Sequence, residues 1–150
     1  MFNQPRLGRQ FVARRQAALD RALERFPRVA AFFQQRWSLP MPRWLAVVDA
    51  CFRSLSPLEK QGADVLGRHP GSVMRLFDDD GPEVKTTDNL DIRLEGRFRC
   101  DPPEMVTVGW GDSDGLHFGL FYDTPERVTG VCSNYARDSA ETYLHPEPTL

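Results

Sequence analysis

The clearest pattern of apolar and polar positions lies in the C-terminal half of the chain. Apolar residues alternate with small or polar ones over 105–110 and again over 116–122, which is the period of a half-buried β-strand. Between these stretches, residues 111–115 read Gly-Asp-Ser-Asp-Gly, and these residue types accept the backbone angles of a tight reversal. The pattern therefore predicts a β-hairpin. On its first strand it places three apolar side chains on one face: Val106, Val108 and Trp110.

Weaker strand signals flank this hairpin. After a turn over 123–126, residues 128–133 have the apolar positions of a third strand in a meander. Upstream, residues 83–86 and 90–99 are further strand candidates. Three side chains of these candidates are expected to point inward: Ile92, Leu94 and Phe98.

The N-terminal half has helical spacing instead. Apolar residues recur every three or four positions over 10–26, with arginines at other positions. Pro27 is expected to end that helix and to begin another, which runs to Trp37. After a linker over 38–42 with two prolines, residues 43–55 predict a third helix.

A further helix start is encoded at Ser56. Ser56 can cap the helix, Pro57 suits its first position, and Glu59 stands three residues after the cap. This helix should run to about residue 66 and end at Gly67.

Helices followed by strands predict an α+β fold, with a helical N-terminal half packed on a mostly antiparallel meander of four or more strands. Residues 69–71 read His-Pro-Gly and predict a turn, whereas 72–77 fit either a short helix or an irregular segment. A chain of 150 residues with 41% apolar residues is long enough for one domain with its own core.

No segment reads as a membrane span or a secretory leader. No apolar run approaches the ~20 residues that cross a bilayer, and the first ten residues, MFNQPRLGRQ, contain no apolar signal core. We therefore expect a cytosolic protein without a membrane partner.

The cysteines and histidines do not form a metal-binding pattern. Cys51, Cys100 and Cys132 are widely spaced, odd in number and flanked by apolar residues, which predicts buried free thiols. No cysteine or histidine pair has metal-ligand spacing, and His117 is interpreted as a structural hydrogen-bonding residue. We expect neither a metal nor another cofactor.

The charge is divided along the sequence. Residues 1–76 hold 13 Lys and Arg against 5 Asp and Glu, a charge of +8, whereas 77–150 hold 6 against 16, a charge of −10. Asp20 and Glu24 lie among the arginines of the first helix and no nucleic-acid motif accompanies them, so we expect no direct nucleic-acid binding. The acidic runs 78–80 and 112–114 lack the ligand spacing of calcium loops and are interpreted as solvated turns.

Several segments of this chain resemble one protein family in their amino-acid sequence. They read SLPMPRWLAVVDACFRSLSPLE over 38–59, DDDG over 78–81, TTDNLDIRLEGRFRCDPPEMVTV over 86–108, WGDSDGLHFGLFYDTPE over 110–126 and SNYARDSAET over 133–142. In this order and spacing they resemble the bacterial SUKH superfamily. The resemblance is strongest to a branch often labelled "ADP-ribosylation family protein". The resemblance covers 38–143.

The resemblance divides the single domain, 1–150, into a family-like core, an N-terminal helical extension over 1–37 and a tail over 144–150. A closing helix is expected after Tyr143, but the chain continues His-Pro-Glu-Pro. Proteins of this superfamily are mostly cytosolic immunity partners of polymorphic toxins. The resemblance thus implies a non-catalytic binding domain that neutralises a cognate toxin by occluding it.

The acidic C-terminal half suits a basic partner, such as a toxin that acts on nucleic acids or nucleotides. Alternation along the strands does not say which aromatic residues belong to the core. The residues expected to contact the partner supply either a negative charge or an aromatic anchor: Asp78, Asp79, Asp80, Asp112, Asp114, Trp110, Phe118, Tyr122 and Tyr135.

Two other functions stay open. An enzyme acting on nucleotide or ADP-ribose groups would need a pocket that gathers Asp112, Asp114 or His117 as acid–base groups. The chain has no nucleophile elbow, phosphate-binding loop, dinucleotide fingerprint or zinc-protease helix, so we assign no catalytic residue. A general regulatory scaffold would instead bind an endogenous protein.

Overall fold

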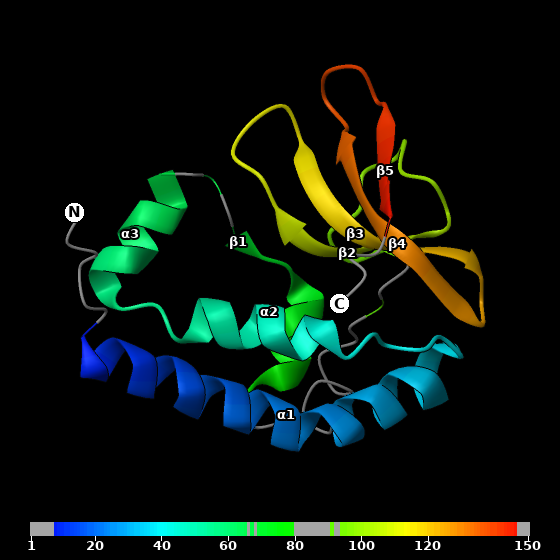
Figure 1. Ribbon diagram of the computed structural model, residues 1–150. Helices are drawn as coiled ribbons and strands as arrows, with labels where there is room; N and C mark the ends of the chain where they lie inside the picture. Colours follow the sequence, from blue (N-terminus) through cyan, green and yellow to red (C-terminus); the bar gives the residue numbers. More distant parts are fainter. Residues whose placement is uncertain (1–7, 66, 68, 80–90, 92–93, 147–150) are drawn as a thin grey trace.

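Helices precede the sheet along the chain, as the sequence predicts for an α+β fold (Figure 1). The computed structural model describes residues 8–65, 67, 69–79, 91 and 94–146. The strands within these ranges form one sheet in the order β1-β2-β3-β4-β5, and each pairs antiparallel with its neighbour. In chain order the elements are α1 (Arg9–Trp37), α2 (Trp44–Arg53), α3 (Pro57–Val65), β1 (His69–Pro70), the 3-10 helix η1 (Ser72–Phe77), β2 (Met105–Trp110), β3 (Leu116–Thr124), β4 (Arg127–Tyr135) and β5 (Thr142–Pro146).

The first helix does not break at Pro27, so the prediction of two helices is wrong. α1 continues for 29 residues and ends at Ser38, whose φ of 59° and N–H bond to the Gln34 carbonyl close the helix. Proline removes one helical hydrogen bond and typically costs about 3 kcal/mol inside a helix. Buried Ala22 before it and buried Phe33 after it pack into the same core, and this burial stabilises one continuous helix.

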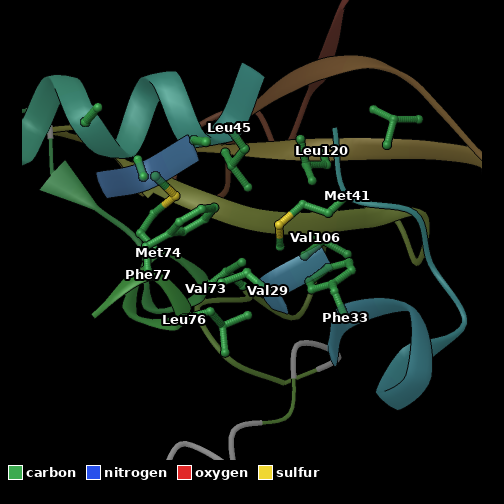
Figure 2. Packing of buried hydrophobic residues seen from close by; sticks show 14 of the residues in the cluster. Val29, Phe33, Met41, Leu45, Val73, Met74, Leu76, Phe77, Val106 and Leu120 are labelled. Atoms are coloured by element: carbon green, nitrogen blue, oxygen red, sulfur yellow. The ribbon is translucent and has the colours of Figure 1, made fainter. Parts of the chain in front are cut away.

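One hydrophobic core joins the helices to the sheet. It is built from α1, α2, η1, β2, β3, β4 and the linker after α1. Each large side chain buried in it contributes roughly 1.5–3 kcal/mol of transfer free energy. Figure 2 shows the central side chains converging: Val29, Phe33, Met41, Leu45, Val73, Met74, Leu76, Phe77, Val106 and Leu120.

The capping box at the start of α3 is confirmed. The Ser56 backbone N–H donates to Glu59 Oε2 at 2.7 Å, and the Glu59 N–H donates to Ser56 Oγ at 3.3 Å. The hydrogen bond from the Ser56 backbone N–H to the carboxylate lowers the pKa of Glu59, because it favours the ionised form.

We expect Ser56→Ala to reduce the free energy of unfolding by about 1 kcal/mol, because the Glu59 N–H loses its acceptor. Urea denaturation followed by circular dichroism measures this loss. Ser113→Ala is the matched control, since Ser113 lies on an exposed turn, and an equal loss in both variants would contradict the capping role.

The predicted hairpin is confirmed, but the sheet face predicted for one of its side chains is wrong. β2 and β3 pair as expected, with an irregularity between Thr107 and Gly109 that places an extra residue in β2. A bulge of this kind shifts the alternation by one position. Trp110 consequently pairs with His117 and lies on the opposite face from Val106.

Residues 94–104 do not form the predicted strand. Leu94 is 76% exposed rather than inward, and the segment consists of turns. Phe98 does point inward, against Trp110 and His117, and the segment thereby covers the sheet face opposite the helices. The strand predicted over 83–86 and the inward position of Ile92 lie outside the described residues.

Both edges of the sheet differ from expectation. Residues 69–70 pair with 109–110 as the short strand β1 rather than forming only a turn. Residues 72–77, left undecided by the sequence, form the 3-10 helix η1. At the other edge, 142–146 form β5 on β4, so the expected tail contributes to the sheet.

The cysteines are free, but only one of the three is buried. Cys132 is buried on β4, and burial raises the pKa of its thiol to about 11. Cys51 and Cys100 are exposed, which contradicts the predicted burial of all three thiols.

Candidate functional site

Two turns form an acidic surface at one end of the sheet. The Arg137 N–H donates to the Asp114 carbonyl at 2.8 Å, so the turn after β2 is joined to the turn after β4. Few basic side chains are present to neutralise the carboxylates here, because Arg137 is the one basic residue in these two turns. We call this surface the acidic end and define it by its exposed carboxylates: Asp112, Asp114, Asp138 and Glu141.

Tyrosines lie beside these carboxylates. Tyr143 on β5 is 48% exposed, and its ring meets the half-buried Tyr135 edge-on at a centroid distance of 6.3 Å. The Tyr143 hydroxyl donates to Glu141, and this hydrogen bond raises the pKa of Tyr143. Half-exposed aromatics next to charged groups are typical anchors of protein interfaces. Tyr135 is among the predicted contact residues, whereas Tyr143 is not, because its strand β5 was not predicted.

The predicted acidic contacts at 78–80 take a different role. Asp78 accepts from Arg53 at 2.8 Å, and Asp79 accepts from Arg25. The hydrogen bond from Arg25 lowers the pKa of Asp79. Asp78 and Asp79 thus hold the end of η1 to the helices, while Asp80 lies outside the described residues.

The four predicted aromatic anchors differ in how deeply they are buried. Tyr122 is only 5% exposed and its hydroxyl donates to the Pro40 carbonyl at 2.8 Å, so little of its side chain is left for a partner to contact. Burial also raises the pKa of Tyr122. Trp110, Phe118 and Tyr135 are half-buried and keep surface that a partner can reach.

His117 has the structural role that the sequence predicts. Its Nδ1 lies 2.8 Å from the Gly115 carbonyl oxygen, and its Nε2 lies 2.8 Å from Asp101 Oδ2. Both side chains are completely buried, so His117 is not gathered with the exposed Asp112 and Asp114 into an acid–base group. The same Asp101 oxygen accepts the Phe98 N–H at 2.8 Å, which fixes the segment that covers the sheet.

A pocket of about 470 Å³ opens between α2, α3, β1 and η1. The sequence did not predict it, because its lining residues, which apart from Trp110 fall within 49–78, enclose a cavity only through the way α2, α3, β1 and η1 pack together. Of the predicted contact residues that the structure describes, Asp78 and Trp110 line it. The remaining lining residues are Asp49, Phe52, Arg53, Leu55, Lys60, Ala63, Asp64, His69, Pro70, Gly71, Met74 and Arg75.

Arg53 organises the charges in this pocket. Its Nε donates to both carboxylate oxygens of Asp49, at 2.8 and 2.7 Å, and its Nη2 donates to Asp78 and to the Met74 carbonyl. Asp49 is only 3% exposed. Burial raises the pKa of Asp49, and the hydrogen bond from Arg53 offsets part of that effect.

The site therefore has two neighbouring parts, an acidic surface and a pocket with paired charges. No model of a known protein family matches the sequence, and no curated protein matches it. In the part of the chain that the structure describes, no helix combines the length and apolarity that crossing a bilayer requires. Within the same ranges, no three His, Cys, Asp or Glu side chains gather as a metal site would need.

Proposed function

We propose that this chain is a non-catalytic protein-binding domain that neutralises a cognate bacterial toxin, as an immunity protein of SUKH-like type. The sequence resemblance over residues 38–143 and the α+β fold support the assignment to a SUKH-like type of protein. The acidic end carries the proposal for the mode of binding, because it combines exposed carboxylates with reachable tyrosines on a fixed pair of turns.

The partner of such a surface is basic. A cluster of carboxylates attracts a basic groove over a distance of about a Debye length. This attraction raises the rate at which the two proteins associate. Tyr135 and Tyr143 then supply the apolar contact on which affinity depends. A toxin that acts on nucleic acids or nucleotides has a basic substrate groove, and occupying this groove blocks its activity.

The acidic end is preferred to the 78–80 run for this contact. Arg53 and Arg25 already neutralise Asp78 and Asp79. By contrast, the side chains of Asp112 and Asp114 are exposed, and the structure shows no ion pair for either of them with the described residues. The contact residues that we propose are therefore Asp112, Asp114, Asp138, Glu141, Phe118, Tyr135 and Tyr143.

We expect the double variant Asp112→Asn, Asp114→Asn to slow association with the toxin about tenfold at low salt and to weaken its salt dependence. Asparagine keeps the size of the side chain and accepts the φ of 51° at position 114. Stopped-flow or surface plasmon resonance kinetics at two salt concentrations measure the effect.

The matched control is Asp123→Asn, Glu126→Gln, which removes two exposed charges at the opposite end of the sheet. An equal slowing in both double variants would indicate a general effect of net charge and would contradict a specific acidic end.

The partner itself is found by affinity capture from the native cells at low salt. The captured protein must arrest growth when expressed alone, and co-expression of this chain must restore growth. Capture of a protein that is harmless when expressed alone would contradict the immunity function and favour a regulatory scaffold.

A further inference from the structure

The pocket between α2, α3, β1 and η1 adjoins the acidic end. Asp112 packs so closely on Gly67, just after α3, that a Cβ atom added to Gly67 would lie 1.8 Å from the Asp112 Cβ. Asp64 and His69, on either side of Gly67 in the chain, line the pocket. The acidic turn and the pocket are therefore adjacent parts of one surface, so one partner can contact both.

The described lining carries both signs of charge in equal number, with the carboxylates Asp49, Asp64 and Asp78 and the cations Arg53, Lys60 and Arg75. Arg53 bonds to Asp49 and Asp78, and His69 Nδ1 lies 3.4 Å from Asp64 Oδ1. A cationic ligand would meet Arg53, and an anionic ligand would meet the buried Asp49. Neither sign of charge is favoured, so the pocket selects an uncharged ligand.

The apolar part of the lining supplies the attraction for such a ligand. It comes from α2, α3 and the loop between them, from β1, η1 and the end of β2, and its members are Phe52, Leu55, Ala63, Pro70, Met74 and Trp110. Trp110 lines the pocket at the end of β2, and contacts of its ring with Phe98 at 6.0 Å and with His117 at 5.8 Å between centroids hold the ring in place. A fixed indole in an apolar wall favours a flat aromatic group through ring–ring contact.

The volume also fits this class of ligand. Ligand pockets span roughly 300–1,000 Å³, and about 470 Å³ accommodates one aromatic side chain with its adjoining backbone. Buried aromatic anchors that enter a pocket of the other protein dominate the affinity of many interfaces.

We propose that this pocket receives an uncharged aromatic side chain, Phe, Tyr or Trp, from the protein that binds the acidic end. This inference rests on the proposed function for the identity of the partner. The acidic end then sets how fast the partner associates, and the pocket sets how slowly it leaves.

The probe for the pocket alone is N-acetyl-L-phenylalaninamide, added to the full-length, 15N-labelled chain and followed by NMR. We expect saturable shifts of the Trp110 indole N–H and of the backbone amides of Ala63 and Gly71. N-acetyl-L-argininamide and an N-acetylated aspartate amide should bind at least about tenfold more weakly. Equal binding of the charged probes, or no saturable shift with the aromatic probe, would overturn the proposal.

A variant that fills the pocket tests the same point with the partner. Ala63→Trp should weaken both the probe and the captured toxin at least about tenfold, chiefly through faster dissociation. Ala17→Trp, on the exposed side of α1 and away from the pocket, should bind both as the unsubstituted chain does. The spectrum of each variant without probe shows whether it is folded.

The two proposals fail in different ways. Loss of toxin binding in the Asp112→Asn, Asp114→Asn variant without any effect of Ala63→Trp would overturn the pocket and leave the immunity function intact. Binding of the aromatic probe in a protein that restores growth against no captured toxin would overturn the immunity function and, with it, the assignment of the pocket to a toxin side chain.

Discussion

Replacing His117 with alanine is expected to reduce the free energy of unfolding by about 4 kcal/mol. The imidazole is completely buried and contacts oxygens with both ring nitrogens. Its removal leaves the buried carboxylate of Asp101 without its partner, which typically costs about 3–5 kcal/mol. Asp101 Oδ1 is already buried without a hydrogen-bond partner among the described residues, so the Phe98 N–H on Oδ2 is the donor that the carboxylate keeps there. Urea denaturation of both proteins measures the difference.

A double-mutant cycle distinguishes the interaction between Asp101 and His117 from a simple loss of packing. The variant Asp101→Ala, His117→Ala should lose clearly less stability than the sum of the single variants, because neither group is then left alone. His69→Ala is the matched control for loss of an imidazole, since His69 is exposed, and it should change stability by less than about 0.5 kcal/mol. Additive losses of Asp101 and His117 would contradict the pairing.

Replacing Arg53 with methionine is expected to reduce the free energy of unfolding by about 2–4 kcal/mol at neutral pH. Methionine keeps the apolar stem but leaves buried Asp49 without a cation. Solvent screens the half-exposed guanidinium, which places the value below that of a fully buried pair. Arg43→Met, immediately before α2 and exposed, is the control.

The pH dependence of this variant follows from Asp49. Burial raises the pKa of Asp49 above its ordinary value of 3.8 in the folded protein. Such a carboxyl stabilises the fold below its unfolded pKa, and this contribution is lost as the pH rises through the folded pKa. Arg53 lowers the pKa, so its removal raises the pKa further and enlarges the loss. The deficit of Arg53→Met should therefore be larger at neutral pH than near about pH 4. A deficit that is independent of pH would show that Arg53 acts through packing alone.

Local signals in the sequence predicted most of the secondary structure. The capping box at Ser56 and the alternation on both strands of the hairpin were confirmed, because hydrogen bonds and side-chain periods act within a few residues. Pro27 shows the limit of such signals. Its local preference is to end a helix, and burial on both sides of it, with remote segments of the chain, overrides that preference.

The candidate site was predictable only in part. Asp112 and Asp114 follow from the turn chemistry of 111–115, whereas the neighbouring Asp138 and Glu141 are added by a backbone bond between two turns. The acidic run at 78–80 looked equivalent in the sequence. Nothing local distinguishes Asp79 from Asp112; the difference is that Arg25 lies beside Asp79 in space.

The sequence by itself determined the α+β plan, the hairpin with its acidic turn and the expectation of a structural His117, because periodicity and residue type suffice for these. Only the tertiary structure decided the facing of Trp110, the neutralisation of Asp78 and Asp79, and the existence of the pocket. A bulge, an ion pair and a cavity each depend on which of several alternative packings the segments adopt. That choice is made by packing of the whole core rather than by any stretch of the chain.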